Sequence, residues 1–437
     1  MDHVCVVGIW HLGAVTAACL ADLGYAVVGV SKDSHKAEAL NRAVPPLFEP
    51  GLQEMMAKNI AAGRLTFTPD LAAGLAGASH VLITYDTPVD DDDQVDLSEI
   101  FAVTRELAGH LDDGSVIVVS SQVPVGTCEE MAAVVRRANP SLRFGIAYVP
   151  ENLRLGQAIQ GFKRPEMTVI GADSEATLQR VEELLAPIDA PRVRTDLRTA
   201  EMTKHAINAY LATSITFANE IANLCDEIGA DALKVAEALR LDSRIGPRAP
   251  LRPGLGFAGG TLARDLKVLR GLSERHSYPA HLIEAVLTVN QRQTGVIVGR
   301  LRRILGSFDG RSVGVLGLTY KAGTSTLRRS NALEFIYAVL AQGASVKAHD
   351  PKADREEVRR HDGFTFCDDP YAVARRSDAL VLVTDWPEFR ALDFPRIRSL
   401  MRNPVLLDAI NVLDAHRMAE AGFHYFGVGR GRQETPA

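Results

Sequence analysis

Three absences narrow what this 437-residue chain can be. Its five cysteines include no CxxC pair, which excludes a compact disulfide framework or a zinc ribbon and predicts reduced, mostly buried thiols. No apolar run approaches the ~20 residues that a membrane-spanning helix needs. The formal charge of −6 leaves no basic surplus for a nucleic-acid partner. We therefore expect no metal site, no membrane contact and no nucleic-acid binding.

The ends of the chain and one acidic run carry smaller predictions. The opening stretch "MDHVCVVGIW" enters a strand at once and leaves no room for a signal peptide, so we expect a cytoplasmic protein. The acidic run "VDDDDQVD" at 89–96 is expected to be a solvated loop, because consecutive carboxylates cannot converge on one metal ion without special geometry. The tail 431–437 is expected to be disordered.

Apolar strands alternate with helical stretches at both ends of the sequence. The strands are "VCVVGI", "AVVGV", "HVLITY" and "SVIVVSS", and later "SVGVLGLTYK", "ASVKAHDP", "ALVLVTDW" and "PVLLDAINVL". Two long helical stretches lie between these sets, and Gly229 stands where the first should end. The pattern predicts an α/β protein with two Rossmann-like, doubly wound domains joined by a central helical region. The expected divisions are 1–195, 196–300 and 301–430.

The turn "GIWHLG" after the first strand resembles the G-x-G-x-x-G fingerprint of dinucleotide-binding domains. Gly8 and Gly13 hold the outer positions, whereas Trp10 replaces the glycine that lets the backbone approach a pyrophosphate. The strand before it, the helix after it and a second strand ending near residue 30 support the interpretation.

The second strand is followed by "VSKDSHK", where an acid usually binds the adenine ribose. Asp33 could accept from the ribose, with Lys36 neutralising phosphate. Alternatively, Ser31 and Lys32 could admit a 2′-phosphate. The sequence favours NAD and leaves NADP open.

A series of ordered motifs then covers nearly the whole chain. They are "VTAACLADLGYAVVGV", "PLFEPGL", "DTPVD", "VPVGT", "PENLRLGQAI", "AEMTKHAINAYLATSITFANEIANLCDEIGAD", "LDSRIG", "GFAGGTLARDL", "GLTYKAGTSTLRRS", "DPKAD", "VTDWPEFRALD" and "GVGR". This set resembles the UDP-glucose/GDP-mannose dehydrogenase family. The resemblance implies an NAD-binding domain, a helical dimerisation core and a UDP-binding domain, and hence a UDP-hexose substrate and a homodimer.

The resemblance also implies a reaction and shows where this chain departs from it. Family members oxidise a sugar C6 alcohol to a carboxylate in two hydride transfers, and a cysteine in a turn GFGGSCFPKD captures the intermediate aldehyde. Here the turn reads "GFAGGTLARD", with Thr261 at the cysteine position. A threonine hydroxyl needs an adjacent base, and no histidine lies in this turn. We expect Thr261 to shape the site without acting as nucleophile.

The same resemblance implies roles for individual residues. Lys204 and Asn208, one helical turn apart and so on one helix face, would stabilise the alkoxide. Asp265, with water, would take the alcohol proton, and Glu151 belongs to the "PE" motif. The implied cofactor-binding residues are Gly8, Gly13, Asp33, Lys36, Thr87, Gln122, Arg264 and Arg328. The implied substrate-binding residues are Glu151, Asn152, Leu153, Lys204, Asn208, Arg244, Gly254 and Lys321, with Arg244 reaching a neighbouring subunit's substrate.

Other departures concern the second half of the family's chemistry. Gln122 replaces a threonine associated with catalytic water, Leu155 replaces a glutamate, and Ile410 replaces an arginine. Cys128 and Cys225 are conceivable substitutes for the missing thiol but are expected to be core residues.

Each polar residue also has a purely structural interpretation. Lys204 and Asn208 would be solvated helix residues, and Asp265 would be a charge favoured near a helix N-terminus. Their joint occurrence in family order favours function.

The leading hypothesis is a dehydrogenase that stops after one oxidation. The alternatives are full four-electron oxidation through an aldehyde hydrate, and a nucleotide-sugar-binding protein with little redox activity. A hydroxyacid dehydrogenase is disfavoured by the last domain.

Overall fold

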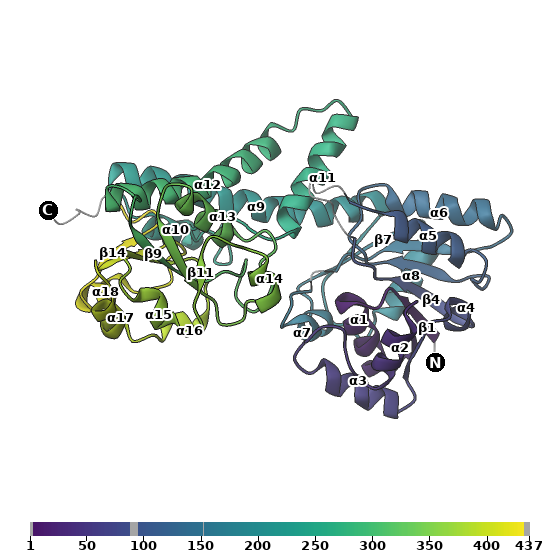
Figure 1. Ribbon diagram of the computed structural model, residues 1–437. Coiled ribbons are helices and arrows are strands. Elements are labelled where there is room, and N and C mark those ends of the chain that lie inside the picture. Colours follow the sequence, from purple (N-terminus) through teal and green to yellow (C-terminus); the bar gives the residue numbers. More distant parts are fainter. Residues whose placement is uncertain (1–2, 88–94, 152, 432–437) are drawn as a thin grey trace. The chain divides into compact units, whose positions relative to one another are not determined.

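The computed structural model describes residues 3–87, 95–151 and 153–431 (Figure 1). The chain forms two compact units, Met1–Ala206 and Ile207–Ala437. Most of the acidic run and Asn152 lie outside the described residues, as do residues 432–437 of the expected tail. The domain boundaries at 195, 300 and 430 stay predictions.

The first unit is built on an eight-stranded sheet in the order β3-β2-β1-β4-β5-β6-β7-β8. Its strands are β1 (His3–Val7), β2 (Ala26–Val30), β3 (Leu65–Thr68), β4 (Ala78–Ile83), β5 (Val116–Val119), β6 (Gly145–Tyr148), β7 (Thr168–Ala172) and β8 (Arg192–Thr195). Val7 pairs with Val30 on one side and Ile83 on the other, so three strands end level with one another. The strand order reverses between β1 and β4, which makes this edge a topological switch point.

Helices cover both faces of this sheet because its strands are apolar on both sides. Along β1, Val4 and Val6 belong to one buried cluster, whereas Cys5 and Val7 belong to another, as the two-residue period of a strand requires. The helices are α1 (His11–Asp22), α2 (Ser34–Asn41), α3 (Leu52–Ala61), α4 (Leu71–Leu75), α5 (Ser98–Leu107), α6 (Thr127–Ala138), α7 (Ala158–Lys163) and α8 (Glu175–Leu184).

The long central helices predicted from sequence are confirmed. Helix α9 (Leu197–Ile228) ends at Gly229, whose φ of +81° is the left-handed conformation that closes many helices. It is followed by α10 (Ala232–Leu241), α11 (Thr261–Arg275) and α12 (His281–Leu305). None of the described helices is both long and apolar enough to span a membrane.

The second unit contains a six-stranded parallel sheet in the order β11-β10-β9-β12-β13-β14. Its strands are β9 (Ser312–Leu316), β10 (Ser345–His349), β11 (Thr365–Phe366), β12 (Ala379–Leu382), β13 (Val405–Asp408) and β14 (His424–Gly427). Its helices are α13 (Asn331–Leu340), α14 (Arg355–Arg359), α15 (Pro370–Ala374), α16 (Pro387–Arg390), α17 (Phe394–Leu400) and α18 (Ala415–Glu420). The predicted fold class is confirmed.

One pair of strands departs from the otherwise parallel pairing of the two sheets. Strands β6 and β7 of the first unit run antiparallel, with Tyr148 paired to Gly171. Gly171 has no room for a side chain, because a Cβ there would lie 2.5 Å from Cβ of Ala200 on α9. This close approach seats the start of α9 against the reversed strand.

Candidate active site

The first unit has a pocket of about 430 Å³ at the carboxyl ends of β1, β2 and β4. Its lining includes Gly8 and Trp10 from the first turn, Ser31 and Asp33 after β2, and Tyr85 after β4. This is the switch point of the sheet, where doubly wound folds bind their ligands.

The two remaining glycines of the fingerprint fit a dinucleotide turn. Gly8 has a φ of +97°, and a Cβ on Gly13 would lie 2.4 Å from the Gly8 carbonyl oxygen. Gly13 therefore keeps α1 close to the turn, as the third glycine of the motif does. The Trp10 side chain is 41% exposed and lines the pocket at the position of the missing glycine. The pocket thus fits NAD at two of the three glycine positions.

A buried carboxylate, which the sequence interpretation missed, holds this turn. Glu49 is 3% exposed and accepts hydrogen bonds from the backbone N–H groups of Gly156 (2.9 Å) and Ala158 (2.8 Å). It also contacts Nε2 of His11, at the start of α1, at 2.9 Å. The signal was present as the acid inside "PLFEPGL".

The side chains of two predicted cofactor residues make local hydrogen bonds. The carboxylate of Asp33 caps α2, accepting from the backbone N–H groups of His35 (3.0 Å) and Lys36 (3.2 Å). The hydroxyl of Thr87 donates to the carbonyl of Gln122 at 2.8 Å, which joins the segments after β4 and β5. Asp33 and Lys36 line the pocket, whereas Thr87 and Gln122 lie outside the lining set.

Lys204 is buried, in contrast to the solvated helix lysine of the purely structural interpretation. It is 7% exposed, and its ammonium donates to the backbone carbonyl of Glu151 at 2.5 Å. The Glu151 carboxylate in turn accepts from the backbone N–H of Leu153 at 2.5 Å. The structure therefore brings Lys204 to the "PE" segment.

Glu201, one helical turn earlier on α9, is a second residue that sequence reasoning missed. It is fully buried and accepts from the backbone N–H groups of Gly126 (2.6 Å) and Cys128 (2.9 Å) at the start of α6. Burial raises the pKa of Glu201, and burial followed by the Glu201 charge raises the pKa of the Cys128 thiol. A buried thiol held protonated is inert, so Cys128 is a core residue, as expected.

Asn208 and Asp265 meet in the second unit. The Asn208 side-chain amide donates to the Asp265 carboxylate, and Asp265 is fully buried. Asp265 is the fifth residue of α11, and its burial and hydrogen bond add to its place near the helix N-terminus. A buried carboxylate that accepts a directed hydrogen bond is held in one orientation, as a catalytic base needs to be.

Amide side chains hold the glycine-rich turn that precedes Thr261. Asn219 accepts from the Gly254 N–H (2.7 Å), and Gln293 donates to the Gly254 carbonyl (2.8 Å). Asn290 accepts from the Phe257 N–H (2.8 Å) and donates to its carbonyl (3.1 Å). Asn331 donates to the Leu255 carbonyl at 2.8 Å. Nothing in their helical spacing marked these four residues as site residues.

Thr261 itself is the first residue of α11 and is exposed. Its hydroxyl makes no hydrogen bond with another described residue. The turn before it is fixed in part by Gly259, whose N–H donates to the Arg329 carbonyl at 3.1 Å.

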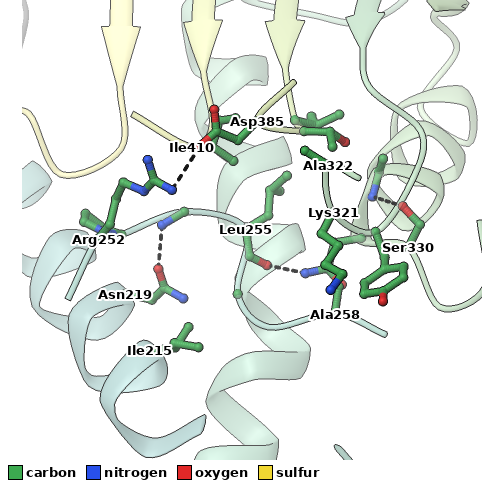
Figure 2. Close-up of a pocket in the computed structure, with 18 of the residues that line it drawn as sticks. Ile215, Asn219, Arg252, Leu255, Ala258, Lys321, Ala322, Ser330, Asp385 and Ile410 are labelled. Atoms are coloured by element: carbon green, nitrogen blue, oxygen red, sulfur yellow. Dashed lines mark hydrogen bonds and ion pairs between the residues drawn. The ribbon is translucent and has the colours of Figure 1, made fainter. Parts of the chain in front are cut away.

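A second pocket of about 380 Å³ opens beside this turn (Figure 2). The predicted substrate residues Gly254 and Lys321 line it, as does Ile410. Figure 2 shows Arg252 and Asp385 joined near Ile410, at an N–O distance of 3.2 Å. The arginine, lysine and asparagine side chains in this lining are suited to binding the diphosphate group of a nucleotide.

The remaining predicted residues line neither pocket. Arg244 is exposed and pairs with Asp242 at 2.6 Å. Arg264 and Arg328 belong to the second unit and line neither pocket. Leu155 is 37% exposed, and Cys225 is buried, as expected. No group of described His, Cys, Asp or Glu side chains is arranged to hold a metal ion.

Comparison with known proteins shows which family this chain belongs to. Three domain models of the UDP-glucose/GDP-mannose dehydrogenase family match in order: the NAD binding domain at 2–189, the central domain at 198–292 and the UDP binding domain at 314–415. The chain is 39% identical over 435 residues to a UDP-glucose 6-dehydrogenase of Rhizobium meliloti, covering 98% of this chain and 99% of the relative. It is 37% identical over 432 residues to the UDP-glucose 6-dehydrogenase TuaD of Bacillus subtilis, covering 98% and 94%.

Solved structures agree with the sequence comparisons. A UDP-glucose dehydrogenase from the archaeon Pyrobaculum islandicum superposes with a TM-score of 0.87 at 33% identity, covering 98% of each chain. A UDP-D-ManNAc dehydrogenase from Pyrococcus horikoshii gives a TM-score of 0.85 at 27% identity, covering 98% of this chain and 99% of that chain. The chain therefore belongs to the UDP-glucose/GDP-mannose dehydrogenase family of NAD-dependent oxidoreductases that act on the CH–OH group of a nucleotide sugar.

Proposed function

We propose that this chain oxidises the C6 alcohol of a UDP-hexose to the aldehyde and releases it after a single two-electron step. The UDP binding domain and the relatives named UDP-glucose 6-dehydrogenases support the substrate class. The observation that carries the single step is Thr261 at the start of α11, with no base hydrogen-bonded to its hydroxyl among the described residues.

The residues kept from the family suffice for this first oxidation. Asp265 takes the hydroxyl proton through water while Asn208 keeps its carboxylate oriented. The ammonium of Lys204 stabilises the negative charge that develops on the alcohol oxygen. NAD, when bound, supplies the hydride acceptor, so the alcohol loses one hydride and one proton.

The second oxidation in the family needs a nucleophile, which this chain does not supply at the same position. A threonine hydroxyl attacks a carbonyl only when an adjacent base removes its proton. Cys128 cannot substitute, because its thiol is buried in the first unit with a raised pKa. The aldehyde therefore leaves without covalent capture.

Cofactor stoichiometry tests this proposal directly. The purified protein is incubated with UDP-glucose and NAD, and NADH formed per sugar consumed is measured, with hydroxylamine added to trap a carbonyl product. We expect one NADH per sugar and a trapped oxime. Two NADH per sugar with a uronate product would establish the four-electron alternative. Binding of UDP-glucose without NADH formation would indicate a nucleotide-sugar-binding protein.

The homodimer is also part of this proposal, supported by an apolar stripe on α9. Tyr210, Phe217 and Leu224 recur every seven residues, and they are 65%, 46% and 57% exposed. Ile228, four residues further on, is 76% exposed. Large apolar side chains repeated at this spacing form one seam along a helix, which a second copy of the chain can cover in a two-fold symmetric contact.

A further inference from the structure

The adenosine end of the cofactor pocket lacks the feature that usually selects NAD. In NAD-binding Rossmann domains, an acid near the end of the second strand binds the ribose 2′-hydroxyl and so disfavours a 2′-phosphate. Here β2 ends at Val30 and the next residue is Ser31, which is buried, neutral and part of the pocket lining. The Ser31 backbone N–H donates to the Thr68 carbonyl at 3.1 Å, which fixes the residue at the strand end.

The nearest acid in sequence, Asp33, is anchored to helix α2. Asp33 uses one carboxylate oxygen to cap α2 through the N–H groups of His35 and Lys36. Its other oxygen lies 3.6 Å from the Lys36 ammonium. Releasing such a cap costs about 1 kcal/mol, so the Asp33 carboxylate stays anchored at the start of α2.

Two lysines border the same part of the pocket. Lys32 and Lys36 both line it, with side chains 52% and 56% exposed. Lys32 pairs with Glu106 at 2.7 Å and Lys36 with Asp33. Exposed pairs of this kind contribute about 0–1 kcal/mol, so both ammonium groups can turn to a stronger anion. A phosphate monoester, with about 1.5–2 negative charges, is such an anion.

Two further carboxylates also line the pocket and limit the strength of this attraction. Asp86 follows β4 and Glu99 lies in the first turn of α5. These two carboxylates come from other segments of the chain, whereas the two lysines both come from the β2–α2 segment.

We propose that the β2–α2 segment of this chain is a 2′-phosphate subsite, so that the protein accepts NADP as well as NAD. Ser31 admits the phosphate because it removes the repelling charge, and Lys32 and Lys36 are its partners. Turnover with either cofactor rests on the proposed function, whereas binding to the subsite does not.

The test compares two fragments that differ only by the 2′-phosphate. Binding of 5′-AMP and of 2′,5′-ADP to the full chain is measured by calorimetry, and quenching of Trp10 fluorescence serves as a second readout because Trp10 lines the pocket. We expect 2′,5′-ADP to bind about tenfold more tightly or better, since each factor of ten corresponds to about 1.4 kcal/mol. Equal or weaker binding of 2′,5′-ADP would overturn the proposal.

Variants separate the residues involved. Ser31→Asp is expected to weaken 2′,5′-ADP by about tenfold or more while preserving 5′-AMP, because it restores the repelling carboxylate. Lys32→Met and Lys36→Met are expected to weaken 2′,5′-ADP alone. Lys58→Met, an exposed lysine on α3 paired with Asp22, is the matched control. Ser31→Asp binding both fragments like the unaltered chain would contradict the assignment.

Cofactor use provides the final readout. The ratio of kcat/KM for NADP to that for NAD is expected to fall in Ser31→Asp by the same factor as the binding ratio. Fragment binding as expected without turnover would leave the subsite standing and remove the proposed function. Turnover with NAD alone and no preference for 2′,5′-ADP would do the reverse.

Discussion

The side-chain amide of Asn208 donates a hydrogen bond to the carboxylate of Asp265, joining α9 to the first turns of α11. Asp265 is fully buried and Asn208 is 7% exposed. Buried polar groups in this position persist because each satisfies the other. The pair therefore fixes the orientation of the carboxylate that we assign as the base.

Replacing this base should remove most of the activity. Asp265→Asn is expected to lower kcat by about 10²- to 10⁴-fold, the usual contribution of a positioned general base. Glu274→Gln, at an exposed position on the same helix, is the control and should leave kcat unchanged. NADH formation with saturating UDP-glucose measures both. Near-normal kcat in Asp265→Asn would assign the proton transfer to another group.

Restoring the thiol should extend the reaction. Thr261→Cys is expected to raise the stoichiometry from one NADH per sugar towards two and to yield a uronate, because a thiol with a pKa near about 8.5, lowered at a helix N-terminus, can capture the aldehyde. Thr261→Ser, which keeps a hydroxyl, should remain at one. The proposed role of position 261 fails if the cysteine variant also stops at one NADH.

Two adjacent glycines in the turn should respond oppositely to alanine. Gly259 has a φ of +77°, and a Cβ there would lie 2.8 Å from the ring of Tyr320. Gly260 has a φ of −90° and open space around its Cα. Gly259→Ala should lower the free energy of unfolding by about 1–3 kcal/mol, whereas Gly260→Ala should change it by less than about 0.5 kcal/mol. Urea denaturation of both variants measures the difference, and equal values would contradict the strain.

Dimer formation should depend on the α9 stripe. Leu224→Glu places a charge at a position 57% exposed in the single chain. Burying an unpaired carboxylate in a subunit interface is costly, so we expect this variant to be a monomer by light scattering. Leu241→Glu, at a residue 82% exposed outside α9, is the control and should stay dimeric. A dimeric Leu224→Glu variant would place the interface elsewhere.

Acid should weaken the first unit through Asp22. Hydrogen bonds from Lys163, 2.5 Å away, and Lys58, 2.7 Å away, hold the pKa of this carboxyl well below its usual range. A folded-state pKa below the unfolded value contributes stability above the unfolded pKa of about 3.9, and that stability is lost as the pH falls below it.

Asp22→Asn should therefore unfold at a lower urea concentration at pH 7, with its free energy of unfolding reduced by about 1–2 kcal/mol. It should also lose less stability than the unaltered chain between pH 5 and pH 2. Asp113→Asn, in an exposed pair with Arg143, should change little. An unchanged acid limb in Asp22→Asn would assign the pH dependence to other carboxylates.

Local patterns in the sequence determined the fold class and most of its elements. Alternating apolar strands and helical periods predicted β1, β2, β4 and β5 and the four matching strands of the second sheet. Gly229 marked the end of α9 correctly, because only a residue tolerant of positive φ closes a helix this way. The family motifs also singled out Lys204, Asn208, Asp265 and Thr261, because motif order is a property of the sequence itself, and the roles of these residues stay predictions.

Tertiary structure decided what each polar group does. From the sequence, Asp33 was equally suited to bind a ribose or to cap a helix, and in the structure its carboxylate caps α2. The reversal at β7 and the amides that hold the turn at Gly254 and Phe257 had no local signal strong enough to predict them, and the acid in "PLFEPGL" did not show which backbone groups Glu49 would bind. Buried backbone groups must find partners, and those partners come from residues brought close only by folding. Which side chain satisfies which backbone group is therefore fixed by three-dimensional proximity.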